Sequence, residues 1–132
     1  IAADGIYMTP QLVYGMVDTN LSVQETEENT GEKVMEPTTA ARLRAYMEST
    51  ARFGTARIGA PQSCVSGIKT GTAQTGVYDE NGEEIENYWY AGYICNAQEE
   101  PLYTLVVLEE TAGEMHVPQA FRKIGEALVD FN

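Results

Sequence analysis

Positive charge is scarce in this chain. Its 132 residues contain 20 Asp and Glu but only 8 Lys and Arg, so the formal net charge is -12 at pH 7. Such a surface repels the phosphates of nucleic acids and the anionic headgroups of lipids. The composition therefore argues against a nucleic-acid or membrane-surface binder and favours an uncharged partner or a basic small molecule.

Long apolar runs are also absent. No stretch approaches the roughly 20 apolar residues that a membrane-spanning helix needs, and no basic segment followed by an apolar one opens the chain. The first residue is Ile1, and residues 1–5 read as the last turn of a helix, closed at Asp4 and Gly5. We interpret the chain as part of a longer protein whose targeting sequence lies upstream.

Side chains that ligate metals are few. The two cysteines, Cys64 and Cys95, and the single His116 do not have the spacing of a metal site. We interpret the cysteines as small buried hydrophobic residues, and a disulfide between them stays open because it depends on strand register. His116 is expected at the surface or at the start of a helix. These residues predict no metal site.

The residues that are present suit one globular unit, residues 1–132, because 43% of them are hydrophobic. A helix is predicted over residues 36–54, with Pro37 in its first turn, Thr38 and Thr39 as candidate caps, and Gly54 as its stop. Its apolar positions at helical spacing are Leu43, Met47 and Tyr46. A second helix begins near Pro118 and presents Phe121, Ile124, Leu128 and Phe131 on one face.

Three strands are predicted between these helices, over residues 63–74, 88–96 and 102–110. Asn81-Gly82 marks a hairpin, and short connections make the strands antiparallel. The third strand is an almost continuous apolar run, which is typical of a strand covered on both faces. Before the first helix, residues 6–17 suit an extended arm or edge strand and residues 24–33 a solvated loop or hairpin tip. The class is α+β in two layers.

Two patterns that resemble catalytic or metal motifs fail on geometry. Ser66 and Lys69 match S-x-x-K, but residues three apart in a strand point to opposite faces, whereas activation of a serine by a lysine needs one face of a helix turn. Residues 79–84 resemble a calcium loop, yet Gly82 is fourth where such loops need a glycine sixth. We interpret that segment as a solvated hairpin tip.

The run from Lys69 to Thr72 is the remaining candidate site. Read alone, it is an ordinary strand with a bulge at Gly71. It also suits an exposed edge strand to which an extended peptide adds as a further strand. Thr70 and Thr72 share one face and can donate hydroxyls to a carboxylate, while Lys69 on the other side supplies positive potential. Gly71 has no side chain to block the approach.

The segment KTGTAQ, Lys69 to Gln74, resembles the third conserved box of the penicillin-binding proteins, serine D,D-transpeptidases that share a fold with serine β-lactamases. The resemblance extends along nearly the whole chain, in order. Residues 1–13 are similar to the segment that follows the second box of the high-molecular-weight transpeptidases. Residues 47–56 resemble their helix end and Gly-Thr turn, and residues 88–110 with the final helix resemble the end of their domain.

The resemblance implies a role for each residue of the box. Lys69 would lend electrostatic support beside a relay serine, and Thr70 and Thr72 would bind the carboxylate of the substrate or antibiotic. The backbone N–H of Thr72 would form half of an oxyanion hole, and Gly71 would permit close approach. In the intact protein a serine would attack the penultimate D-Ala carbonyl of a peptidoglycan stem peptide, and an amine of a neighbouring stem would resolve the acyl-enzyme. β-Lactams would acylate the same serine, and the resemblance implies no metal and no organic cofactor.

The first two boxes of this family are missing from the chain. Apart from the rejected Ser66, no S-x-x-K occurs, and no S-x-N box occurs, so the chain holds no nucleophile. The resemblance thus implies the C-terminal part of a transpeptidase domain, a partial β-lactamase/transpeptidase-like fold that is not catalytic alone. Its expected partners are the remainder of its own domain, the stem peptide and β-lactam antibiotics. The parent is expected to be membrane-anchored, with this domain outside the cytoplasmic membrane.

Several alternatives stay open at this stage. The parent could be a serine β-lactamase or a β-lactam sensor, because both share the third box, or the chain could be a catalytically dead binding or scaffold module. Gln74 and Trp89 are interpreted as structural. We further expect exposed apolar surface and a bare strand edge, so that the isolated chain forms a homodimer or shields that edge with its N-terminal arm.

Overall fold

The main sheet has three antiparallel strands in the order β5, β6, β7. A computed structural model describes residues 1–26, 30–111 and 114–130. The strands are β5 (Ser66–Tyr78), β6 (Glu84–Cys95) and β7 (Pro101–Thr111), and consecutive strands pair. The turn between β5 and β6 is the predicted one. There Gly82 has a φ of 83°, and the Asp79 carboxylate accepts the N–H groups of Asn81 and Glu83, each at 2.8 Å.

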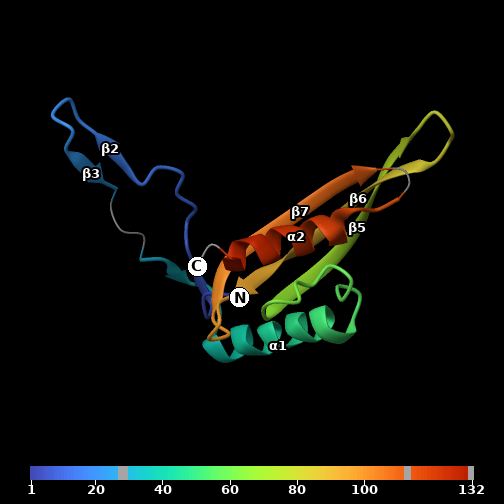
Figure 1. Cartoon of the computed structure of the whole chain (residues 1–132), viewed down its shortest axis with the longest axis horizontal. Coiled ribbons are helices and arrows are strands. Elements are labelled where there is room, and N and C mark those ends of the chain that lie inside the picture. Colours follow the sequence, from blue (N-terminus) through green and yellow to red (C-terminus); the bar gives the residue numbers. More distant parts are fainter. Residues whose placement is uncertain (27–29, 112–113, 131–132) are drawn as a thin grey trace.

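The two long helices flank this sheet differently (Figure 1). Helix α1 (Pro37–Phe53) packs beside β5, and helix α2 (Val117–Asp130) packs on β6 and β7. The prediction of Thr38 or Thr39 as the cap of α1 is wrong. The N-cap is Glu36, with no side-chain cap hydrogen bond, because Pro37 lacks an N–H, has its φ preset for a helix and so takes the first helical position.

The start of α2 is held by a carboxylate from the sheet. Glu109 on β7 accepts the N–H groups of His116 and Val117 at 2.6 and 2.7 Å, and its other oxygen lies 3.0 Å from His116 Nδ1. Burial acts to raise the pKa of Glu109, but these hydrogen bonds outweigh it and hold the pKa below the ordinary 4.5. His116 therefore lies where the sequence places it, at the start of the helix. Phe131, assigned to the apolar face of this helix, lies outside the described residues.

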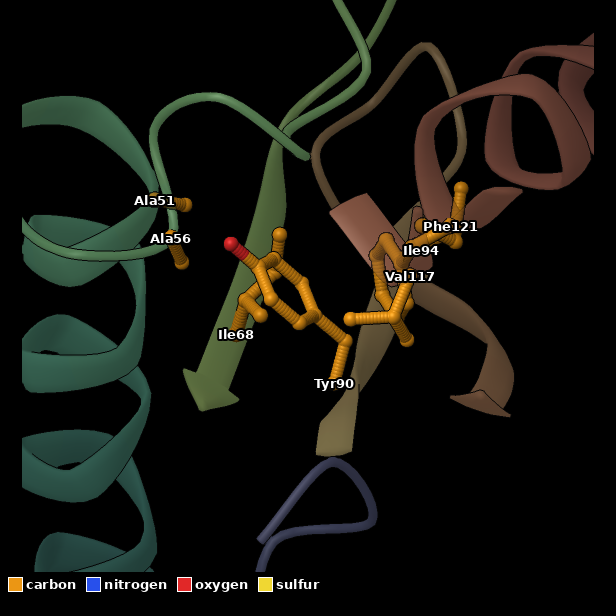
Figure 2. Packing of buried hydrophobic residues seen from close by; sticks show 7 residues of the cluster. All are labelled: Ala51, Ala56, Ile68, Tyr90, Ile94, Val117 and Phe121. Atoms are coloured by element: carbon orange, nitrogen blue, oxygen red, sulfur yellow. The ribbon is translucent and has the colours of Figure 1, made fainter. Parts of the chain in front are cut away.

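The core joins α1, the sheet and α2, as Figure 2 shows. Its buried side chains come from the end of α1 and the following turn, from β5 and β6, and from α2: Ala51, Ala56, Ile68, Tyr90, Ile94, Val117 and Phe121. The rings of Tyr90 and Phe121 meet with centroids 5.8 Å apart. This contact fastens α2 to the central strand.

The apolar run of β7 predicted a strand covered on both faces. This prediction is wrong, because one face of β7 is exposed. Its residues alternate between half-buried and exposed, with Val106 55% and Leu108 48% exposed. Tyr103, Leu105 and Val107 pack toward α2, whereas the alternate residues face the opposite side of the sheet. In the described part of the chain α1 covers only the β5 side of that face, so the apolar pattern of β7 exceeds what this chain itself buries.

The N-terminal part is an arm that projects from the sheet (Figure 1). Strand β1 (Ile6–Tyr7) pairs with β4 (Glu32–Lys33), and β2 (Gly15–Val17) pairs with β3 (Val23–Glu25). The prediction of a solvated loop or hairpin tip over residues 24–33 is therefore wrong at both ends, which are strands, and residues 27–29 lie outside the described part. None of the described arm strands pairs with β5, so of the two expected alternatives, a homodimer or an edge shielded by the arm, the structure does not show the second.

Apolar surface is exposed along the arm, as predicted. The large side chains concerned are Leu12, Val13, Tyr14, Met16, Val17, Leu21 and Val23. Among the described helices, neither is long and apolar enough to cross a membrane.

Candidate functional site

The Lys69–Thr72 run lies where β5 emerges from the core. Ile68 is fully buried, whereas Lys69, Gly71 and Thr72 are exposed and Thr70 is half-buried. Because β5 is the outermost strand of its sheet, one side of this exposed stretch pairs with β6 and the other is an edge. The structure thus brings all four predicted site residues to one open strand edge.

Strand pairing decides which way these side chains point. Thr70 lies opposite Tyr90, and Thr72 lies opposite Tyr88. Since directly opposed residues share a face and Tyr90 packs on Phe121, both threonine side chains lie on the α2 side of the sheet. Lys69 lies on the other face, opposite Ala91. Two hydroxyls and one ammonium therefore flank the same edge from opposite faces.

The backbone of this edge also has a definite direction. The N–H of Cys95 donates to the carbonyl of the directly opposed Val65 at 2.9 Å, so odd-numbered residues of β5 bond to β6. Even-numbered residues then aim their N–H and C=O groups at the edge. The carbonyl of Ile68 there accepts the hydroxyl of Thr50, and the carbonyl of Thr70 accepts the ammonium of Lys69. The N–H of Thr72 consequently points outward from the sheet.

Two glycines of β5, Gly67 and Gly71, differ in the space available for a side chain. A Cβ added at Gly67 would lie 2.4 Å from the ring of Tyr93, which is buried and hydrogen-bonded to Glu48. A Cβ added at Gly71 would meet only Trp89, at 3.6 Å, which is an ordinary van der Waals contact. The fold of this chain therefore requires glycine at position 67 but not at position 71.

One further residue lies at the site, although the sequence predicts no role for it there. Thr55, in the turn after α1, has its Oγ1 3.0 Å from the Oγ1 of Thr70. Its carbonyl accepts the hydroxyl of Tyr90 at 3.3 Å. The pattern of residues carries no signal for this contact, because it depends on how the turn folds back onto β5. The family resemblance includes the Gly54-Thr55 turn but implies no role for Thr55.

The other residues that the sequence analysis considered do not contribute side chains to the open edge at Lys69–Thr72. Ser66 is 5% exposed and lies on the α2 face, opposite the face of Lys69, as expected for residues three apart in a strand. Gln74 donates from Nε2 to Glu84 at 3.1 Å. Within the described residues, no cluster of three or more His, Cys, Asp or Glu side chains could hold a metal ion.

Both cysteines are free thiols. Burial raises the pKa of Cys95 to about 11, and it also raises the pKa of Cys64 above its ordinary value. Each thiol is thus held in its protonated, weakly nucleophilic form at neutral pH.

An apolar groove of about 730 Å³ adjoins the site on the Lys69 face of the sheet. Its walls come from the start of the chain, from α1 and from all three sheet strands, and they include Ile6, Met47, Lys69, Tyr93 and Val106. The exposed alternate residues of β7 open toward this space. An unfilled apolar groove beside a bare strand edge is a surface that a further element can cover.

Comparisons with known proteins agree on one kind of domain. The family model for the penicillin binding protein transpeptidase domain matches residues 1–126. No curated protein sequence matches the chain at a significant level. Among solved structures, the D,D-transpeptidase domain of a peptidoglycan glycosyltransferase from Eggerthella lenta is 28% identical, with a TM-score of 0.73 over 96% of this chain and 29% of that one.

Two more distant structures share the fold. A peptidoglycan synthetase from Bifidobacterium adolescentis is 18% identical, with a TM-score of 0.81 over 98% of this chain and 24% of that one. Penicillin-binding protein A from M. tuberculosis, solved as an imipenem acyl-enzyme complex, is 23% identical, with a TM-score of 0.72 over 99% and 28%. This chain therefore spans less than a third of the length of each of these three structures.

Proposed function

Because the chain belongs to the penicillin-binding protein transpeptidase family, which serves peptidoglycan synthesis, we propose that it supplies the substrate-binding wall of a transpeptidase site. In this proposal an extended stem peptide lies along the open edge of β5 as an added strand. The chemistry is acyl transfer at a D-Ala-D-Ala end. The nucleophilic serine comes from another part of a longer protein, since neither S-x-x-K on a helix nor S-x-N occurs here.

Each residue of the box has a role that its geometry supports. The hydroxyls of Thr70 and Thr72 bind the terminal carboxylate of the peptide, or that of a β-lactam, because both lie on one face of the strand. The ammonium of Lys69, from the other face, attracts the anionic ligand and supports proton transfer at the missing serines. In a chain of net charge -12 this local positive charge matters for an anionic substrate.

The observation that carries the proposal is the outward N–H of Thr72. A donor aimed away from the sheet at an open edge is placed to meet the carbonyl oxygen of a peptide lying there. That oxygen becomes an oxyanion during acyl transfer, and loss of one such donor costs about 2.7–4 kcal/mol in a serine protease. Gly71 supports the same reading, since among the described residues an added Cβ there would meet only Trp89, in ordinary contact.

The remainder of the domain is the proposed occupant of the apolar groove. The groove holds about 730 Å³ and opens beside Lys69, so an element packed there would face the box directly. The chain spans 24% to 29% of its structural relatives, which leaves ample sequence for such an element in a protein of similar size. We further propose that the longer protein is anchored in the cytoplasmic membrane with this domain outside it.

The test is intact-mass spectrometry after incubation with a labelled penicillin. The longer protein should gain one stable adduct and this chain alone none. Rapid loss of the label from the longer protein would indicate a hydrolase of the β-lactamase type, and no adduct would favour a binding or scaffold module. An adduct at Ser66 of the isolated chain would contradict the assignment of the nucleophile to another part.

A further inference from the structure

Thr55 is held in place from several directions. Its neighbour Ala56 is fully buried in the core, and its carbonyl accepts the hydroxyl of Tyr90 at 3.3 Å. Tyr90 is itself 4% exposed and packed on Phe121. The turn that carries Thr55 is therefore tied to the same core that positions the central strand, and its hydroxyl is presented to Thr70 at 3.0 Å.

The two hydroxyls of this pair share a limited number of protons. Each threonine hydroxyl has one proton to donate and lone pairs to accept with. A carboxylate only accepts hydrogen bonds, so a Thr70 hydroxyl that binds a carboxylate must donate its single proton to it. The 3.0 Å contact can then persist only if Thr55 donates and Thr70 accepts.

We propose that Thr55 is a positioning residue for ligand binding at this edge. By donating to the Oγ1 of Thr70, it turns the Thr70 proton toward the carboxylate and keeps that hydroxyl from rotating away. The chain of donation polarises the Thr70 hydroxyl, which strengthens its bond to an anion. In this role Thr55 acts through the Thr70 hydroxyl and not on the ligand directly. The inference rests on the proposed function and adds to it a residue outside the box.

The test uses the full-length protein with two probes, a penicillin with a free carboxylate and its methyl ester. Thr55→Val keeps the shape of the side chain and removes the donor, whereas Thr55→Ser keeps the donor. We expect Thr55→Val to slow acylation by the carboxylate probe about three- to tenfold, the effect of one lost hydroxyl hydrogen bond. Acylation by the ester should not change, and Thr55→Ser should restore the rate to within about twofold of the original.

A Thr70→Val background supplies the decisive control. With the Thr70 hydroxyl gone, removing the Thr55 hydroxyl should have no further effect on the carboxylate probe. If Thr55→Val does not fold, Thr55→Ala provides the same comparison without a branched side chain. Equal slowing of both probes, or additive effects of the Thr55 and Thr70 changes, would overturn the inference.

The same experiment separates this inference from the function on which it rests. If the unmodified protein forms no adduct, or reacts equally with the acid and the ester, the proposed carboxylate site at Thr70 and Thr72 is wrong, and the role given to Thr55 is overturned with it. If the unmodified protein prefers the acid and Thr55→Val keeps the same preference, only the role of Thr55 is wrong.

Discussion

Gly71→Ala should separate the function of β5 from its folding. The new Cβ would lie 3.6 Å from the Cβ of Trp89, an ordinary contact that needs no rearrangement. Glycine inside a strand is destabilising by roughly 0.5–1 kcal/mol relative to alanine, since it loses more conformational freedom on folding. The substitution should therefore leave the free energy of unfolding unchanged or raise it by up to about that amount.

Activity should respond in the opposite direction. The added methyl would stand on the Lys69 face of the exposed edge, where, apart from its neighbours in the chain, Trp89 is the only described residue within 4 Å. If a ligand or the nucleophile approaches there as closely as proposed, overpacking of about 1–3 kcal/mol would slow acylation by roughly 5- to 150-fold. The assay is the second-order rate of labelling by a penicillin, measured on the full-length protein.

The matched control is Gly67→Ala, four residues earlier in the same strand and on the same face. Its Cβ would lie 2.4 Å from the ring of Tyr93, whose hydroxyl bonds to Glu48 at 2.9 Å, so the ring cannot move without breaking that contact. We expect a loss of stability of about 1–3 kcal/mol, seen in thermal unfolding. A Gly71→Ala protein that is labelled at the normal rate, or that is as unstable as Gly67→Ala, would refute the reasoning.

Three further outcomes are expected. Glu109→Gln should lower the stability of the domain by about 1 kcal/mol, as loss of a charged helix cap does, measured by denaturant unfolding. The contribution of Glu109 to the free energy of unfolding should be present above pH 4.5 and disappear as the pH falls through its lowered folded-state pKa. The Glu109→Gln protein should not show this pH-dependent loss of stability. Cys95, whose pKa is raised to about 11, should resist alkylation at neutral pH until the protein unfolds. The isolated chain should sediment as a dimer. The Val106→Glu variant should sediment as a monomer, because it places a charge in the groove. An unmodified chain that sediments as a monomer would contradict this prediction.

Local patterns predicted the strands and helices because each depends on neighbours in the chain. Pro37 and Gly54 bound α1, the Asn81-Gly82 pair marks the β5–β6 turn, and the apolar spacing around Phe121 defines the buried face of α2. The arm was harder to predict, since Glu32–Lys33 becomes a strand only by pairing with Ile6–Tyr7, far away in the chain. Nothing in a polar segment of the sequence indicates such a partner.

For the candidate site, the sequence alone determined the chemistry available: a lysine, two hydroxyls and a glycine at alternating positions of one strand. Tertiary structure decided everything that depends on partners distant in the chain. It made β5 an edge, turned the N–H of Thr72 outward, and brought Thr55 to the hydroxyl of Thr70. The reason is physical: alternation along a strand is a local property, whereas which side of the strand remains unpaired depends on what the rest of the chain packs against it.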